Sequence, residues 1–515
     1  MNFLKKLNEN YFVYAILFFT FIPLNFLPQL FDGVAIDYVY NSDDKSALVN
    51  WYKEASRFTH LALVFIIDFL VKYTQLPSEI FFDNLTVLFL ILFCFEVKKY
   101  SKIFFNLEER WCNLSALFAA IIPIWHTLVA FNIGQYVSSF YFLLFGYRYF
   151  VSKNKIKVIL GLIFIVLSFD VESNLSFVIG LALVSLILKE TRKTFNISYF
   201  KFTLLLIICL IYYFFVRNIY FPTSGLLENY NTPTFESFSE NIFSIKFVNN
   251  IYNYSTFLLP YLLIPLIFIL NFDFINDNFL SKIKLKLKNK YKFKYFFDYF
   301  LLLILAGFAT APYLLMGKSS SLFYLSDYFQ RHAFLLAPIF GIFFSIMFRD
   351  LEKINCLASK VNLNLYLIAF VTINLVLLNY GNYRKVESYL YRINLINEFK
   401  NYGAIPQGNA LFIGKNLPAD LRYYELNYIM YKSYNKAGWW AIPYHPIVNK
   451  DPKFPPSFII NDKNYLKLYV SDDYKYECAL YIYIKNDMTK LDRFKKFYIF
   501  NYKKYYNIDK IVKKC

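Results

Sequence analysis

Residues 200–216 read FKFTLLLIICLIYYFFV, an almost unbroken apolar run with a single cation at Lys201. A helix rises about 1.5 Å per residue and must cross roughly 30 Å of hydrocarbon, so an apolar run near twenty residues predicts a membrane-spanning helix. Similar runs recur along the chain. We count eleven candidates, at residues 11–30, 81–97, 113–130, 131–147, 156–169, 174–188, 200–216, 256–272, 297–315, 333–348 and 361–379.

The composition agrees with a membrane protein. Of the 515 residues, 57% are hydrophobic and 18% are charged, and the mean hydropathy is +0.37. Soluble domains average near 25% charged residues. The net charge of +19 comes mainly from 44 Lys among 55 basic residues, and the six cysteines are too few for a disulfide scaffold. We therefore predict a lipid bilayer as partner and no nucleic acid.

The positions of the basic residues predict the orientation of the spans. With the N-terminus inside, the inner segments hold 24 Lys and Arg, and the outer segments between spans hold 8. Cytoplasmic loops carry such an excess. We therefore predict a multi-pass protein of the cell membrane with a cytoplasmic N-terminus, a helical bundle over residues 1–380, and a long first outer loop over 31–80.

Two segments depart from the pattern of spans. Residues 59–75 carry Asp68 and Lys72, which are four apart and can pair on one helix face, so we predict a helix at the outer interface. Residues 381–515 are polar and turn-rich, with helices predicted at 384–400 and 419–434 and strands at 409–414 and 476–484. The predicted fold is an all-α polytopic membrane bundle with a small extracytoplasmic α/β domain. A disulfide between Cys478 and Cys515 is left open.

Carboxylates lie close to the membrane on the predicted outer side. Asp32 and Asp37 follow the first span directly, and a carboxylate there could act as a general base or hold Mg²⁺ or Mn²⁺ against a phosphate. The alternative is an ordinary acidic turn. Asp170 and Glu172 lie in a tight outer turn and need a partner from elsewhere in the bundle or a metal. Helix capping within that turn is the competing interpretation.

A second outer turn carries cationic groups. Arg331 and His332 precede a predicted span, and guanidinium and imidazole groups suit the recognition of phosphate. The alternative is an interfacial Arg that reaches out of the membrane. His126 and the other three histidines also fall on the predicted outer side, without the spacing of a zinc site. We group His126 with Asp170 and Glu172 as supporting polar residues.

Two helices carry a family resemblance. The segment from Glu109 to Pro123, ERWCNLSALFAAIIP, and the span that begins Arg331-His-Ala-Phe-Leu-Leu-Ala-Pro338 resemble helices of the GT-C membrane glycosyltransferases. The long acidic first outer loop is also similar to theirs. The resemblance implies transfer of a sugar from a polyprenyl-phosphate carrier to a glycan, lipid or protein acceptor on the outer face. It also implies that Asp37, or else Asp32, is the catalytic carboxylate and that Arg331 meets the carrier phosphate.

Some residues depart from the family pattern. Asp37 is followed by Tyr38 where the family has an Asp-Glu pair. Trp439 and Trp440 are candidates for stacking on acceptor sugars, and the alternative is that they anchor the tail at the membrane. Other functions remain open: a polysaccharide polymerase or ligase, a non-enzymatic transporter of lipid-linked glycans, and a structural membrane protein.

Overall fold

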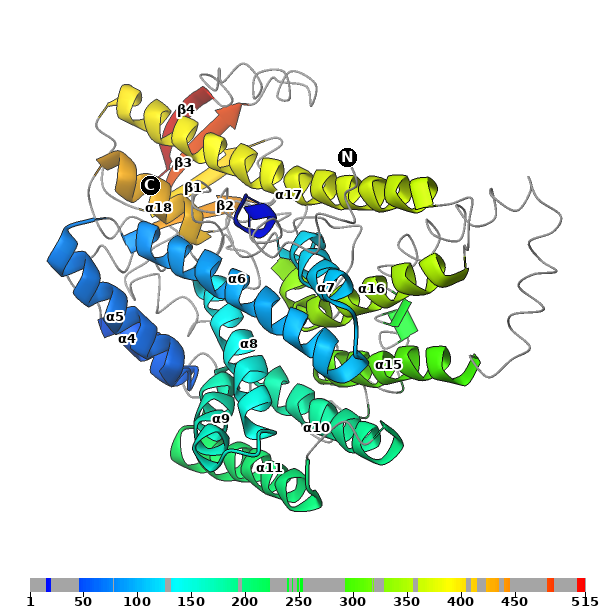
Figure 1. The fold of residues 1–515 in the computed structure, drawn as a ribbon. Coiled ribbons are helices and arrows are strands. Elements are labelled where there is room, and N and C mark those ends of the chain that lie inside the picture. Colours follow the sequence, from blue (N-terminus) through cyan, green and yellow to red (C-terminus); the bar gives the residue numbers. More distant parts are fainter. Residues whose placement is uncertain are drawn as a thin grey trace.

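The chain is described by a computed structural model that is mostly helical (Figure 1). The structure describes residues 15–19, 46–76, 78–125, 131–192, 197–222, 292–316, 328–354, 360–403, 409–414, 423–434, 440–444, 479–485 and 507–514, with single positions at 239, 243, 248, 249, 251, 252 and 318. The predicted spans at 11–30 and 256–272 fall mostly outside these residues.

The first half of the described chain is a series of helices. They are α4 (Ser46–Glu54), α5 (Phe58–Thr74), α6 (Ser78–Phe105), α7 (Glu109–Ile121), α8 (Phe131–Phe150), α9 (Lys155–Leu167), the 3-10 turn η3 (Ser168–Asp170), α10 (Ser173–Arg192), α11 (Tyr199–Ile211) and the π-helix η4 (Tyr212–Tyr220). After residue 291 come α15 (Lys292–Leu315), the 3-10 segment η6 (Tyr328–Ala333), α16 (Leu336–Ile354) and α17 (Lys360–Tyr402).

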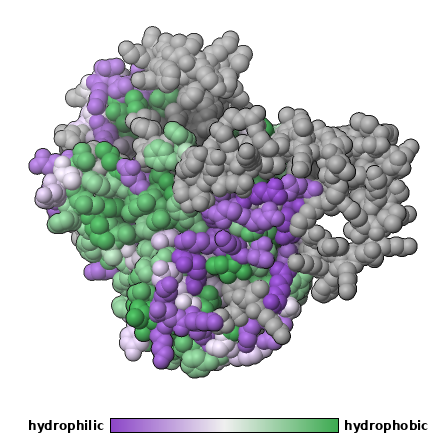
Figure 2. Space-filling view, viewed as in Figure 1, coloured by the Kyte–Doolittle hydropathy of each residue, from purple (hydrophilic) through white to green (hydrophobic). Residues whose placement is uncertain are grey.

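Several of these helices suit a membrane. Within the described residues, four helices are long and apolar enough to cross one: Ile80–Phe105, Ser173–Arg192, Tyr199–Tyr220 and Phe297–Leu315. They coincide with the predicted spans at 81–97, 174–188, 200–216 and 297–315. Figure 2 shows a broad hydrophobic area over α5 and α6, where exposed side chains include Phe65, Phe69 and Leu88. The apolar surface is what contact with lipid requires.

Polar side chains cap the N-termini of two of the helices. The Asn154 side chain accepts hydrogen bonds from the backbone N–H groups of Ile156 and Lys157, at 2.9 and 3.3 Å, and so caps α9. The Ser198 hydroxyl accepts from the Lys201 N–H at 3.1 Å and caps α11. These first-turn donors have no carbonyl partner within their own helix, so a side-chain acceptor fixes where the helix begins.

Glycines let the helices approach closely. A Cβ on Gly146 of α8 would lie 2.8 Å from the carbonyl oxygen of Gly161 in α9. At Gly180 of α10 it would lie 2.7 Å from the Cβ of Phe308 in α15, and Gly341 of α16 packs on the backbone of Ser115 in α7. Small residues at helix interfaces are typical of membrane bundles, because dispersion contacts replace the hydrophobic drive.

The segment predicted at the outer interface forms α5. It lies beside α6 (Figure 1), and its Asp68 and Lys72 pair as expected, with the ammonium nitrogen 2.7 Å from the carboxylate oxygen. Residues His60, Val64 and Ile67 are buried, while Phe69 is 67% exposed. At 17 residues, α5 is not among the helices long enough to be counted as a span.

The last part of the described chain differs from the prediction in one respect. The predicted span at 361–379 and the predicted helix at 384–400 form a single helix, α17, of 43 residues, which runs through the predicted boundary at 380/381. One interior glycine, Gly381, costs only about 1 kcal/mol in a helix and does not end it. After α17 come β1 (Asn409–Gly414), α18 (Tyr423–Tyr434), β2 (Trp440–Tyr444), β3 (Ala479–Lys485) and β4 (Asn507–Lys514).

The strands form one sheet with the order β2-β1-β3-β4. β1 pairs parallel with β2 and β3, and β4 pairs antiparallel with β3. β1 occupies the range predicted for a strand at 409–414, and β3 overlaps the range predicted at 476–484. α18 packs on α17, where the Tyr434 hydroxyl donates to the carbonyl of Phe399 at 3.0 Å.

Candidate functional site

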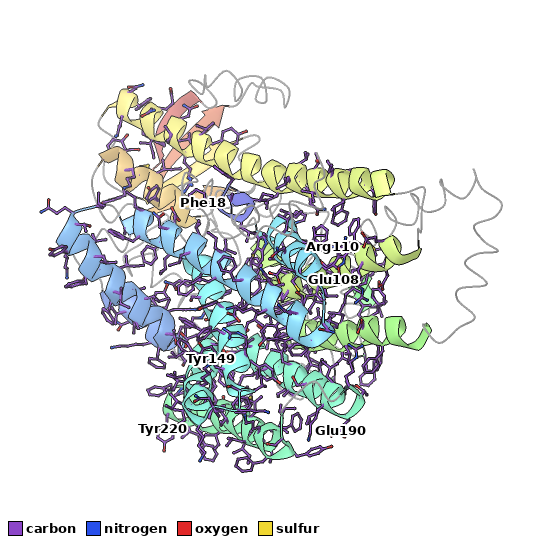
Figure 3. All side chains as sticks on the ribbon, viewed as in Figure 1. Phe18, Glu108, Arg110, Tyr149, Glu190 and Tyr220 are labelled. Atoms are coloured by element: carbon purple, nitrogen blue, oxygen red, sulfur yellow. The ribbon has the colours of Figure 1, made fainter. Side chains whose placement is uncertain are left out.

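Polar side chains from six segments meet at one end of the bundle, the end predicted to face outward. The segments are the α4–α5 turn, the start of α8, the η3–α10 turn, the end of η4, the end of α15, and η6. Figure 3 shows Tyr220, the last residue of η4, at the opposite side of the bundle from Glu190, Glu108 and Arg110. These six segments form the candidate site, which we call the outer polar cluster.

Asp170 fixes α5 to this cluster. Its carboxylate accepts a hydrogen bond from the backbone N–H of His60 at 2.9 Å, within the first turn of α5. A carboxylate at a helix N-terminus satisfies an unbonded N–H and meets the positive end of the helix dipole. Burial raises the pKa of Asp170 to about 6, against the opposing effects of the His60 N–H and the Arg57 charge. Asp170 is therefore a positioning group for α5.

Glu172 ties the end of η4 to the same turn. Its carboxylate forms an ion pair with Arg217, whose guanidinium also donates to the carbonyl of Ala55 at 2.9 Å. The Ser56 hydroxyl donates to the carbonyl of Phe221. The partner that Glu172 needs from elsewhere in the bundle is thus Arg217. Together these contacts hold the α4–α5 turn, in which Ser56 has a left-handed φ of 53°.

That turn presents Arg57, the residue just before α5. Its guanidinium donates to the Tyr136 hydroxyl at 2.8 Å and lies over the Tyr136 ring, 5.1 Å from the ring centre. The His60 ring also stacks on the Tyr136 ring, with the ring centres 5.9 Å apart. Asp170 accepts from the His60 N–H and Arg217 donates to the Ala55 carbonyl, so the backbone is fixed on both sides of Arg57. The Arg57 side chain therefore extends in one direction, towards Tyr136. Its position depends on three segments distant in sequence: the start of α8, the η3–α10 turn and the end of η4.

Arg331 and His332 lie across the cluster on η6. His332 is buried and packs against the Tyr313 ring, with the ring centres 4.7 Å apart. The Tyr313 and Ser173 hydroxyls lie 3.0 Å apart, which connects η6 to the start of α10. The predicted pair Arg331 and His332 therefore lies on the same side of the bundle as the predicted pair Asp170 and Glu172.

Lys318 adds a third cation. Its backbone N–H donates to the carbonyl of Tyr313 at 2.8 Å, which holds it at the end of α15. Burial, followed by the positive charge of Arg331, lowers the pKa of Lys318 to about 8; Tyr136 and the Glu172 carboxylate oppose this shift, and the charge of Arg57 adds to it. Arg57, Lys318 and Arg331 therefore share one electrostatic neighbourhood. We call these three residues the cation triad.

A buried polar layer supports the triad. The Tyr52 hydroxyl donates to the Gln135 side chain at 2.8 Å, and the His60 imidazole lies 3.1 Å from the Ser139 hydroxyl. Burial lowers the pKa of His60 well below its usual range, and the Arg57 charge adds to this effect, so the imidazole is neutral at pH 7. The layer joins α4 and α5 to α8.

Sequence reasoning did not select Arg57, Lys318, Tyr136 or Tyr313. Arg57 and Lys318 are two of only eight basic residues in the predicted outer segments between spans. That scarcity was a signal available before the structure. The tyrosines carried none, because 47 tyrosines occur in the chain.

Several predicted site residues fall outside the described part of the chain. These are the proposed catalytic carboxylates Asp32 and Asp37, the supporting His126, and Trp439. Trp440 begins β2 at the edge of the sheet. In the part of the chain that the structure describes, no group of three or more His, Cys, Asp or Glu residues is arranged to hold a metal ion.

No family model matches the chain, and no curated protein is significantly similar to it in sequence. The chemistry of the site is therefore argued from its residues.

Proposed function

We propose that the chain is a membrane glycosyltransferase that moves a sugar from a polyprenyl-phosphate carrier to a glycan, lipid or protein acceptor on the outer face of the cell membrane. The observation that carries the proposal is the cation triad, Arg57, Lys318 and Arg331, beside the Tyr136 and Tyr313 hydroxyls. In this proposal the eleven-span topology holds, and the tail forms an outer α/β domain that helps to hold the acceptor.

The triad suits a phosphate that bears one negative charge in the donor and gains a second when the sugar leaves. The pKa of Lys318 is lowered first by burial and then by the charge of Arg331, with a smaller contribution from Arg57. An anion beside these groups would offset both the burial and the repulsion. Arg adds paired N–H donors and Lys a compact ammonium, both in the geometry that phosphate oxygens accept. An anion-binding site at the end of a bundle with an apolar surface fits a ligand whose phosphate carries a lipid tail.

The reaction needs positive charge where the phosphate leaves. The acceptor hydroxyl oxygen forms a bond to C1 of the sugar, the bond between C1 and the phosphate oxygen breaks, and the polyprenyl phosphate departs with the electron pair. A carboxylate takes the hydroxyl proton, and we assign this role to Asp37, or else to Asp32, of the first outer loop. The triad stabilises the charge that develops on the phosphate, which is the larger contribution in many transfers.

Phosphate binding is the first test. Purified protein is titrated with farnesyl phosphate, a short polyprenyl phosphate, and with farnesol. We expect the phosphate to bind and the alcohol not to, and Lys318→Gln/Arg331→Gln to weaken binding about 100-fold, because hydrogen bonds to charged groups contribute roughly 1.5–3 kcal/mol each. Lys72→Gln, at an exposed outer cation in an ion pair, is the control and should bind normally. Equal binding by all three proteins would refute the phosphate site.

Turnover is the second test. The protein is incubated with hexose- and pentose-loaded polyprenyl phosphates and membrane lipid extract, and released polyprenyl phosphate is counted. We expect one donor to be consumed by the wild type and not by Asp37→Asn. Binding of farnesyl phosphate without consumption of any donor would instead favour a non-enzymatic carrier of lipid-linked glycans.

A further inference from the structure

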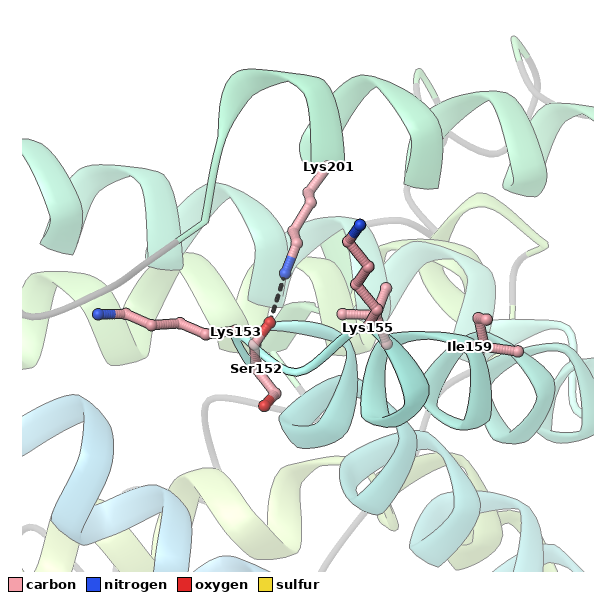
Figure 4. Close-up of a pocket in the computed structure, with 6 residues that line it drawn as sticks. Ser152, Lys153, Lys155, Ile159 and Lys201 are labelled. Carbon is pink, nitrogen blue, oxygen red and sulfur yellow. Dashed lines mark hydrogen bonds between the residues drawn. The ribbon is translucent and has the colours of Figure 1, made fainter.

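A second charged site lies at the other end of α9 from the outer polar cluster. A cavity of about 500 Å³ opens between the α8–α9 turn and the start of α11 (Figure 4). Its lining consists of Ser152, Lys153, Lys155, Val158, Ile159 and Lys201, three of them lysines and none of them acidic. The 13 residues of α9 separate the cavity from Asp170 by about 20 Å. The two sites therefore belong to opposite ends of the bundle.

Lys201 is held in place at this cavity. Its ammonium donates to the carbonyls of Phe150 and Ser152, at 2.9 and 2.7 Å, and so closes the end of α8. Figure 4 shows Lys155 extending from α9 towards α11, while Lys201 extends from α11 to the Ser152 carbonyl. An ammonium has three donors, so Lys201 has one more to offer a ligand. The cavity thus has one anchored cation and two exposed ones.

An exposed apolar surface continues from the lysines along both helices. On α9, Ile156 is 69% exposed, and Ile159 and Ile163 are also exposed. On α11, Phe200 and Ile207 are exposed in the same way. α11 belongs to one of the helices long and apolar enough to cross a membrane. The cavity therefore combines a cationic head with an apolar flank.

We propose that this cavity binds the headgroup of an anionic phospholipid, with the acyl chains lying over α9 and α11. Three lysines without an acidic neighbour in the lining match a phosphodiester, and the apolar flank matches the chains. Basic pockets between spanning helices on the cytoplasmic side recognise anionic lipids in this way. A soluble phosphate would use the lysines but not the flank. The inference is independent of the proposed sugar transfer.

The test measures lipid retention by native mass spectrometry. Purified protein is titrated with phosphatidylglycerol and, separately, with phosphatidylcholine. Lys153→Gln/Lys155→Gln removes the two exposed cations and leaves Lys201 to hold α8. We expect the variant to bind phosphatidylglycerol roughly 30-fold more weakly than the wild type. Each Lys near an anionic lipid surface contributes about fivefold in affinity, and the variant removes two.

The matched control is Lys102→Gln/Lys189→Gln. It removes the same charge from the same predicted inner side, at lysines whose carboxylate partners lie 3.6 and 3.7 Å away, and it should bind phosphatidylglycerol like the wild type. Equal weakening in both variants would show a general charge effect and overturn the site. Equally tight phosphatidylcholine binding, or full displacement by glycerol phosphate, would overturn the anionic-lipid assignment.

Discussion

The two ends of the bundle differ in how their charged side chains are arranged. At the end predicted to face inward, buried carboxylates are matched with arginines from neighbouring helices. Glu96 of α6 makes a two-bond contact with Arg148 of α8, at 2.6 and 3.0 Å, and Asp298 of α15 bonds both Arg192 of α10 and Arg349 of α16. At the outer end, the cation triad gathers like charges, and the nearby Glu172 is already paired with Arg217.

This difference distinguishes charged side chains that hold helices together from charged side chains that are suited to bind a ligand. A matched buried pair fixes two helices against each other and has little left to offer a ligand. A cluster of like charges destabilises the empty site and becomes favourable when an anion enters. The inner pairs therefore serve the fold, whereas we propose that the outer triad binds an anion.

The largest expected effect is at the inner end. Glu96 is 1% exposed, and Glu96→Gln would leave the Arg148 guanidinium without its carboxylate between α6 and α8. Breaking one partner of a buried pair costs about 3–5 kcal/mol of unfolding free energy. Denaturant unfolding in detergent should show this loss. Arg331→Gln at the outer end should cost less, because the charge of Arg331 opposes that of Lys318, and an equal loss in both variants would remove the contrast.

An intermediate effect concerns pH at the outer end. Asp170 has a pKa of about 6 in the folded chain, against an ordinary value of 3.8. The folded state therefore binds more protons between pH 4 and 6, so this residue makes the unfolding free energy fall as pH rises through that window, by about 1.4 kcal/mol per unit of pKa difference. Unfolding measured from pH 4 to 7 should show the slope in the wild type and lose it in Asp170→Asn. Matching profiles would contradict the assignment.

The smallest effect is expected on the exposed face of α5. Lys72 has a side chain 71% exposed and pairs with Asp68 one turn away. Exposed pairs of this kind contribute about 0–1 kcal/mol, because solvent screens them. Asp68→Asn should therefore change unfolding free energy by less than about 0.5 kcal/mol and leave farnesyl phosphate binding unaltered. A loss comparable to that of Glu96→Gln would show that α5 depends on this pair.

Local patterns anticipated much of the helical layout. The four helices suited to a membrane, the pairing of Asp68 with Lys72, and the strand at 409–414 follow from hydrophobic runs and short-range spacing. The continuity of α17 was not anticipated, because the change from apolar to polar residues near 380 predicted a separate helix at 384–400. The predicted boundary at 380/381 falls within α17.

The sequence by itself determined the apolar helices, the asymmetry of basic residues and the placing of Asp170, Glu172, Arg331 and His332 in turns at helix ends, because these depend on composition and neighbouring residues. Only the tertiary structure decided that Glu172 pairs with Arg217, that Asp170 caps α5, and that Lys318 lies near Arg57 and Arg331. The Glu172–Arg217 and Asp170–His60 contacts join residues 45 and 110 positions apart. No local pattern can encode such contacts, since they depend on which turns the packed helices bring to the same end.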